Sequence, residues 1–325
     1  MIFVVTTPGH DYTSKALRTW PFESEVPLVK ATDYRKLFRF ETVPWATYVF
    51  ADIDRLYTWE RHLAAEMYRS MVAAGLRCLN DPARVLTRYP LLRALARTGI
   101  NPFDVYRADD APRPCRFPVF IRGEWDHERP DLELYETQSA LDEALQRRLD
   151  RGVPLADLLV VEFVDLCDAR GHYHKLSSFR FGGEFHYDHR YVSERWVTKF
   201  HKGSEHLWTE EMLAEDRLAV LANETPAAVR RAFEIGGIEW GRADYGFVGG
   251  RSAVFEINTN PNVVRFGPEP ASFFEETRLI GRRRIAQLML EIDSEPGSPV
   301  SIEPGERIAE YRRRLAADGA PPERP

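Results

Sequence analysis

Four polar side chains late in the sequence have the types and the spacing of a site for a hard cation. They are Arg242, Asp244, Glu256 and Asn258, which flank a pair of adjacent glycines. Two glycines between two largely apolar runs predict a β-hairpin. Carboxylate and amide oxygens are the ligands that Mg²⁺ prefers, and phosphate oxygens and water usually complete its coordination. The segment therefore predicts a magnesium site on a hairpin.

The register of this hairpin decides whether the two carboxylates meet. A two-residue loop would put Asp244 and Glu256 on opposite faces. A three-residue loop, in which Val248 pairs with Ser252, puts Asp244 opposite Glu256 and the other two polar residues opposite each other. We expect the three-residue loop, because it leaves a uniformly apolar second face made of Ala243, Tyr245, Phe247, Ala253, Phe255 and Ile257.

The alternative interpretation of this segment is a surface hairpin held by salt bridges. Directly opposed carboxylates at Asp244 and Glu256 would destabilise such a hairpin unless a cation lay between them. We therefore favour the metal site over the salt-bridged hairpin.

The pattern R-x-D-(Y/F)…(F/L)-E-(I/V/A)-N-x-(N/S)-P, which runs here from Arg242 to Pro261, resembles the C-terminal signature of the ATP-grasp superfamily. That superfamily includes D-alanine–D-alanine ligases, glutathione synthetases and ribosomal-protein glutamate ligases. The resemblance implies that Asp244, Glu256 and Asn258 coordinate two Mg²⁺ ions bridging the ATP phosphates. It also implies that Arg242 stabilises the transferred phosphate, a role that suits a planar guanidinium group.

Strand and helix signals alternate along the chain, which predicts an α/β class. The resemblance implies an ATP-grasp fold, with an α+β C-terminal part and two subdomains that clasp ATP. We expect a small N-terminal α/β domain over 1–80, a central subdomain over 81–160 and a C-terminal subdomain carrying the metal hairpin over 161–292. The residues over 293–325 are rich in proline, glycine and charge, and we expect them to form a tail.

Local signals predict the main elements of these parts. Asp81, followed by proline, predicts a helix that begins at Pro82 and runs to Thr98. The other predicted helices cover 55–74, 140–151, 210–222, 226–235 and 271–292. The predicted strands cover 2–6, 47–52, 117–122, 158–165, 172–181, 184–192 and the hairpin over 242–258.

The buried run over 158–165 is similar to the strand and hinge against which the family binds adenine. The resemblance implies that backbone groups of Glu162 and Val164, with Phe163 between them, read the adenine edge. It also implies that Asp165 or Asp168 holds the ribose. Without the resemblance, this segment is only a core strand.

Several basic residues are candidates for binding phosphate or a substrate carboxylate. Arg122 ends a strand at a position where the family usually has a lysine, and Arg88 stands where it often has another phosphate-binding cation. Lys175 and Arg180 lie on a strand that we expect to face the cleft. Only six of the 44 basic residues are lysines, so Lys175 is a candidate for a role that needs a compact ammonium group. The alternatives are helix arginines without a special role and a charged edge strand.

Two further residues are candidates for contacts with the substrate. The resemblance implies that Asn260, just after the metal strand, projects toward the acceptor. His127 lies in a loop that lacks the Gly/Ser-rich sequence of the best-known members, and we assign it to substrate binding. A surface loop with chance aromatic residues is the alternative at this position. Four histidines in the middle of the chain lack zinc spacing and are not assigned to a metal.

Composition restricts the possible partners. The 325 residues are 44% hydrophobic and 29% charged, which indicates a globular protein, and the net charge of −6 argues against a general nucleic-acid or membrane binder. No apolar run reaches the length of a membrane span. Three cysteines without metal-ligand spacing are typical of reduced thiols in a cytoplasmic protein. We expect a small-molecule or peptide substrate, and a homodimer is compatible with the sequence.

The resemblance implies an ATP- and Mg²⁺-dependent ligase. Such an enzyme phosphorylates a substrate carboxylate, and an amine or a thiol then displaces phosphate from the acylphosphate. Arg242 and Lys175 are the candidate catalytic residues. The alternatives are a kinase that uses the same cleft and a nucleotide-binding regulatory protein without catalysis.

Overall fold

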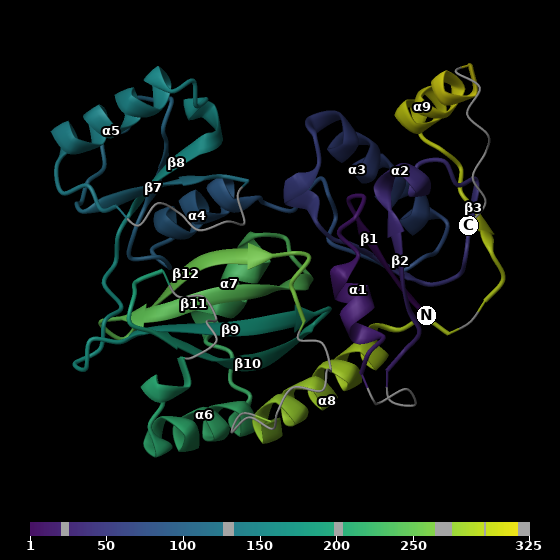
Figure 1. Cartoon of the computed structure of the whole chain (residues 1–325). Helices are drawn as coiled ribbons and strands as arrows, with labels where there is room; N and C mark the ends of the chain where they lie inside the picture. The colour runs from purple at the N-terminus through teal and green to yellow at the C-terminus, as the bar shows by residue number, and fades with distance from the viewer. Residues whose placement is uncertain (21–25, 126–132, 198–203, 264–274, 296, 318–325) are drawn as a thin grey trace.

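The computed structural model describes the chain from residue 1 to residue 317, apart from residues 21–25, 126–132, 198–203, 264–274 and 296. Three main β-sheets, each packed against helices, make up the molecule (Figure 1). The predicted α/β class is confirmed. Within the described residues, no helix combines the length and the apolar character needed to cross a bilayer.

The N-terminal sheet has four parallel strands in the order β2-β1-β4-β5. These are β1 (Ile2–Thr6), β2 (Val29–Asp33), β4 (Thr47–Phe50) and β5 (Cys78–Leu79). The helices of this unit are α1 (Tyr12–Leu17), α2 (Tyr34–Leu37) and α3 (Thr58–Ala73). The central strands β1 and β4 are almost fully buried, as is usual for parallel strands covered on both faces. The apolar runs that predicted them are confirmed as strands.

The central sheet has three antiparallel strands in the order β6-β8-β7. They are β6 (Val105–Arg107), β7 (Val119–Gly123) and β8 (Leu158–Glu162). Helix α5 (Gln138–Asp150) packs its buried side chains against this sheet. It begins after Thr137, whose side chain accepts a hydrogen bond from the backbone N–H of Ala140.

The C-terminal sheet has four antiparallel strands in the order β10-β9-β11-β12. They are β9 (Tyr173–Phe181), β10 (Glu184–Ser193), β11 (Trp240–Val248) and β12 (Arg251–Asn258). Helices α6 (Glu210–Ala222) and α8 (Glu275–Ile292) lie along β10, and α7 (Ala227–Ile235) packs against β11 and β12 (Figure 1). This sheet carries the predicted hairpin.

The helix predicted from Pro82 starts six residues later than expected, at Arg88. Helix α4 (Arg88–Arg97) begins at Arg88, and the Asp81 carboxylate instead accepts a hydrogen bond from the N–H of Ala83. The cause is tertiary, because Asn80 is buried with a positive φ of 64° and its amide bonds the backbone of Phe50 and Trp240. This cross-link holds the start of the 80–87 loop against two different sheets.

The prediction of a C-terminal tail over 293–325 is wrong for the part that the structure describes. Strand β13 (Val300–Ser301) pairs with β3 (Thr42–Val43), and helix α9 (Glu306–Ala317) packs against α3. Ile302 and Ile308 are buried in the N-terminal core. These two apolar residues hold the charged segment against the N-terminal unit. The overall polar composition of the segment did not predict this, because a few buried side chains are enough to order it.

Candidate active site

The hairpin of β11 and β12 brings the predicted polar residues into two directly opposed pairs. Asp244 lies opposite Glu256 and Arg242 opposite Asn258, as predicted. The predicted three-residue loop is wrong, because Val248 pairs with Arg251 across a two-residue Gly249-Gly250 turn. Both glycines have positive φ (54° and 76°), which is the backbone that a type I′ hairpin turn requires.

A β-bulge restores the predicted pairing. Tyr245 pairs with Val254 while Asp244 pairs with Glu256, so Phe255 is an extra residue in β12. The apolar face therefore contains Val254 where Ala253 and Phe255 were expected. Phe255 instead stacks on Phe103 in the core of the central unit. Because of the bulge, Val254 and Phe255 pack into two different hydrophobic cores, while the two carboxylates stay opposite each other.

Basic side chains on the same face of the sheet neutralise Asp244. Strand β9 places Lys175 and Ser177 beside β11, and the Lys175 ammonium lies 2.8 Å from the Asp244 carboxylate. The Arg242 Nε lies 3.2 Å from the second Asp244 oxygen. An aromatic ring lies beside each cation, because Lys175 lies over the Tyr191 ring and Arg242 over the Phe179 ring. Lys175 and Arg242, predicted as catalytic residues, are therefore adjacent.

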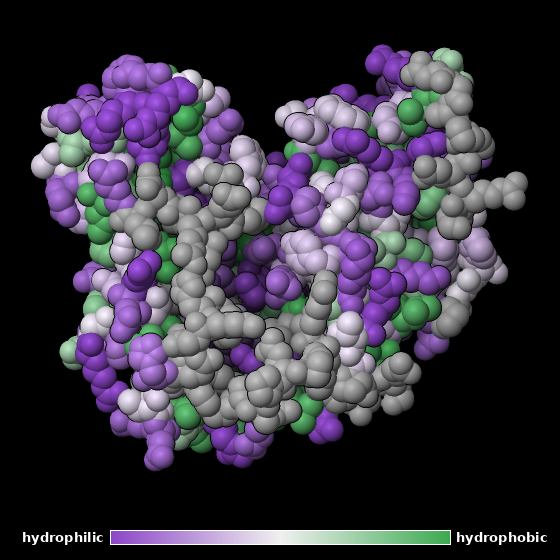
Figure 2. Space-filling model, viewed as in Figure 1, coloured by the Kyte–Doolittle hydropathy of each residue, from purple (hydrophilic) through white to green (hydrophobic). Residues whose placement is uncertain are grey.

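Two arginines from the central part of the chain reach Glu256. Arg88, at the first turn of α4, donates to its carboxylate at 2.6 Å, and Arg122, on β7, lies 3.8 Å away. Figure 2 shows hydrophilic side chains inside the hollow between the lobe of α5 and the lobe of α3. Arg88 and Arg122, two candidate phosphate-binding residues, thus converge on Glu256, a predicted metal ligand, from positions more than 130 residues away in sequence.

The charges of this cluster shift the pKa values of its members. Burial alone would raise the pKa of the Glu256 carboxyl, but the charges of Arg88, Arg122 and Lys175 hold it well below its usual value. Burial would lower the pKa of Arg242, and its acidic neighbour Asp244 outweighs that effect and raises it. Glu256 and Arg242 are therefore ionised at neutral pH.

The donor set of the hairpin fits Mg²⁺. Two opposed carboxylates, Asp244 and Glu256, and the amide oxygen of Asn258 are hard oxygen donors. The Asn258 oxygen also accepts the backbone N–H of Asn260 at 2.8 Å, which fixes the orientation of its amide. Among the described residues, no group of three or more His, Cys, Asp or Glu side chains has the arrangement of a metal site. The case for Mg²⁺ at this hairpin therefore depends on the chemistry of these three oxygen donors.

Asp188 is a member of this cluster that sequence reasoning did not identify. A bulge in β10 puts Asp188 and His189 opposite Ser177, whose hydroxyl lies 3.2 Å from the Asp188 carboxylate. Burial would raise the pKa of Asp188, but the charges of His189 and Arg242 keep it well below its usual value. No pattern in the sequence signals this residue, because its position depends on an irregular strand.

On the predicted adenine strand, the Glu162 side chain forms its hydrogen bonds within the protein. Its buried carboxylate accepts hydrogen bonds from the Tyr106 hydroxyl, the backbone of Asp104 and Cys115, and the Arg116 guanidinium. The backbone N–H of Glu162 is bonded to Asp104 as well. The side chain therefore anchors the 104–116 loop.

The hinge after this strand is aromatic. The Phe163 backbone N–H donates to the Pro118 carbonyl, and the Phe163 ring packs at 5.5 Å from Trp196, which also contacts Phe120. Val164 is half-buried beside it. Asp165 is exposed, and its carboxylate accepts the backbone N–H of Cys167.

The anchoring role of Glu162 gives a stability prediction. Replacing Glu162 with alanine leaves several donors of the 104–116 loop without an acceptor, so we expect it to lower the free energy of unfolding by about 2–3 kcal/mol. Urea titration measures this loss. The exposed Glu136→Ala change is the matched control, and we expect it to stay within about 0.5 kcal/mol of the parent protein. Equal stabilities of the two variants would contradict the anchoring role.

The structure places the predicted substrate residues differently from expectation. Arg180 lies five positions after Lys175, so it occupies the opposite face of β9, and its guanidinium donates to the carbonyls of Gly182 and Ile238. Asn260 is fully buried, and its amide bonds Thr13 and the backbone of His10, which ties the hairpin to the N-terminal unit. His127 lies outside the described residues.

The fold and the site define an α/β protein in which three units meet around a cluster of carboxylates and cations. No protein-family model matches the sequence, and no curated protein matches it significantly. The chain is similar in structure to the D-alanine–D-alanine ligase of Bacillus anthracis complexed with ATP, at 10% identity and a TM-score of 0.47, covering 97% of this chain and 99% of that chain.

Two further solved structures are similar to most of the chain. The RimK domain protein ATP-grasp from Sphaerobacter thermophilus is 15% identical, with a TM-score of 0.48 and coverage of 89% of this chain and 98% of that one. The D-alanine–D-alanine ligase from Coxiella burnetii is 12% identical, with a TM-score of 0.49 and coverage of 99% and 100%. We base the functional proposal on the residues of the site.

Proposed function

We propose that this protein is an ATP- and Mg²⁺-dependent ligase that activates a carboxylate as an acylphosphate and joins it to an amine. The observation that carries the proposal is the opposed Asp244–Glu256 pair, with four basic side chains from four different elements around it. Such a cluster suits a polyanion that arrives with divalent cations, because the cations of the protein can then pair with phosphate oxygens. The sequence motif of the hairpin supports the same chemistry.

In this proposal Asp244, Glu256 and Asn258 hold two Mg²⁺ ions. When bound, these ions neutralise charge on the ATP phosphates. Arg88, Arg122 and Lys175 bind phosphate oxygens, and the segment over 162–165 binds the adenosine.

Arg242 and Lys175 stabilise the phosphoryl group while it moves from ATP to the substrate carboxylate. Arg242 is held in place by Asp244 and by the carbonyl of Asn262, at 3.2 Å each, so its guanidinium is oriented before the reaction. The amine then attacks the acyl carbon, the C–O bond to phosphate breaks, and an amide and inorganic phosphate form. We propose a small molecule or a peptide as substrate and the cytoplasm as location.

Hydroxylamine trapping tests the proposed reaction. We would incubate the protein with Mg²⁺, ATP, hydroxylamine and a panel of amino acids and dipeptides, and measure ADP and hydroxamate. Carboxylate-dependent formation of both products in equal amounts is the expected result. ADP formation with a stable phosphorylated product and no need for an amine would replace the ligase with a kinase. Stabilisation by ATP without any ADP would indicate a nucleotide-binding protein without catalysis.

A further inference from the structure

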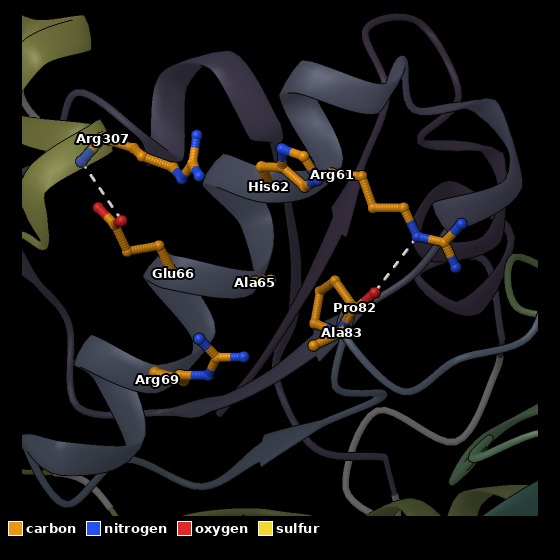
Figure 3. Close-up of a pocket in the computed structure, with 8 residues that line it drawn as sticks. All are labelled: Arg61, His62, Ala65, Glu66, Arg69, Pro82, Ala83 and Arg307. Carbon is orange, nitrogen blue, oxygen red and sulfur yellow. Dashed lines mark hydrogen bonds between the residues drawn. The ribbon is translucent and has the colours of Figure 1, made fainter.

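A second basic pocket lies on the N-terminal unit, between α3 and the start of α9. Its volume is about 410 Å³, within the range of about 300–1,000 Å³ that small-molecule pockets occupy. Arg61, His62, Glu66 and Arg69 from α3 and Arg307 from α9 line it (Figure 3). None of these residues belongs to the candidate active site.

The single carboxylate of this pocket is already engaged. The two oxygens of Glu66 accept the backbone N–H groups of Arg307 and Ile308, at 3.3 and 2.9 Å, and thereby cap the first turn of α9. The negative charge of Glu66 therefore offsets the partial positive charge at the N-terminus of α9, and only part of it neutralises the arginines of the pocket.

The arginines of the pocket differ in their partners. Arg61 donates to the carbonyl oxygens of Pro82 (3.2 Å) and Val85. For the guanidinium groups of Arg69 and Arg307, which are both exposed, the part of the chain that the structure describes supplies no hydrogen bond or ion pair. Figure 3 shows these two side chains extending from α3 and from α9 beside the same pocket. Two like charges beside one cavity favour an anion between them.

We propose that this pocket binds the phosphoryl group of a small molecule, at a site separate from the candidate active site. A phosphoryl group carries a charge of about −1.5 to −2 at neutral pH, which matches the two guanidinium groups of Arg69 and Arg307. Guanidinium groups bind its oxygens in pairs of parallel hydrogen bonds. His62 and Arg61 lie at the same pocket and add polar donors for the rest of the ligand.

The pocket is connected to the candidate active site by one loop. Pro82 and Ala83 line the pocket, and a few residues later Arg88 contacts Glu256. Arg61 holds this loop through its carbonyls, so a ligand that orders Arg61 also orders the loop that carries Arg88. Occupancy of the pocket therefore reduces the motion of residues 82–88.

Calorimetric titration with sodium phosphate tests the binding site. We compare Arg69→Gln/Arg307→Gln with the charge-matched control Arg97→Gln/Arg313→Gln, which removes two exposed arginines elsewhere. Both variants are made in an Arg122→Gln/Arg242→Gln background, which weakens phosphate binding at the candidate active site equally in the two proteins that are compared. We expect phosphate to bind at least tenfold more weakly to the first variant than to the control. Equal affinities would overturn the proposal.

Two further measurements address the ligand class and the loop. Sodium succinate at matched ionic strength should bind at least tenfold more weakly than phosphate to the control, and equal binding would overturn the phosphoryl assignment. Backbone amide exchange over residues 83–88 should slow when phosphate saturates the control, and unchanged exchange would overturn the connection to the loop. None of these tests requires ATP turnover, so failure of the proposed ligase activity would be seen separately.

Discussion

Replacing Arg242 with lysine is expected to lower the rate of the phosphoryl-transfer step by about a thousandfold, since an arginine that stabilises a transferred phosphoryl group contributes at least that much. Lysine keeps the positive charge but loses the planar set of donors that now bonds the Asp244 carboxylate and the Asn262 carbonyl. The loss should fall on turnover, while the affinity for ATP changes little, because Arg88, Arg122 and Lys175 keep their contacts.

Single-turnover ADP formation and equilibrium binding of an ATP analogue separate these two effects. Arg231→Lys is the matched control, because Arg231 is an exposed arginine whose ion pair, within the described residues, is with Glu234 three residues away. We expect this control to keep the parental rate. If Arg242→Lys turned over at the parental rate, Arg242 would have no role in phosphoryl transfer.

Replacing Glu256 with glutamine is expected to lower ADP formation by about a hundredfold and to raise the Mg²⁺ concentration needed for half-maximal activity. Glutamine has nearly the same shape but no charge, so the site loses one anionic metal donor, and the expected hundredfold corresponds to about 2.7 kcal/mol in the transition state. Arg88 and Arg122 also lose the carboxylate that now balances them.

Initial rates over a range of Mg²⁺ concentrations measure both parts of this prediction. Glu184→Gln, an exposed carboxylate at the start of β10, is the control for loss of one negative charge. An unchanged Mg²⁺ dependence in Glu256→Gln, at the parental rate, would remove Glu256 from the metal site. A lowered rate with unchanged Mg²⁺ dependence would assign it to positioning Arg88 and Arg122 alone.

The site has features of both interpretations of the hairpin, the salt-bridged one and the metal-binding one. The opposed carboxylates of Asp244 and Glu256 are paired with Lys175, Arg88 and their neighbours, so cations of the protein itself offset their mutual repulsion. The same cations would have to pair with a different anion when a divalent ion approached the carboxylates. This exchange of partners is the physical reason that a polyphosphate and Mg²⁺ are expected to bind together.

Local pattern predicted the hairpin and its facing pairs, Asp244 with Glu256 and Arg242 with Asn258, but through a three-residue loop that is wrong. The observed two-residue turn gives the same pairs only because a bulge adds one residue to β12, and no local pattern predicted that bulge. The spacing of Lys175 and Arg180 also carried the information that they lie on opposite faces, because five is an odd number of residues along a strand. The prediction that both side chains face the cleft is therefore wrong for Arg180, which bonds the carbonyls of Gly182 and Ile238.

The sequence by itself determined the class of the fold, the hairpin and the identity of its oxygen donors, because these depend on contacts between residues near each other in the chain. Only the tertiary structure decided which cations meet them, that Asp188 joins the cluster and that Asn260 is used for packing. Arg88 and Arg122 lie on different elements from the hairpin, and the periodicity of apolar residues in the sequence does not predict the distance between separate elements. Likewise, the charged segment that ends in α9 is folded because Ile302 and Ile308 pack into a hydrophobic core that residues distant in the sequence form.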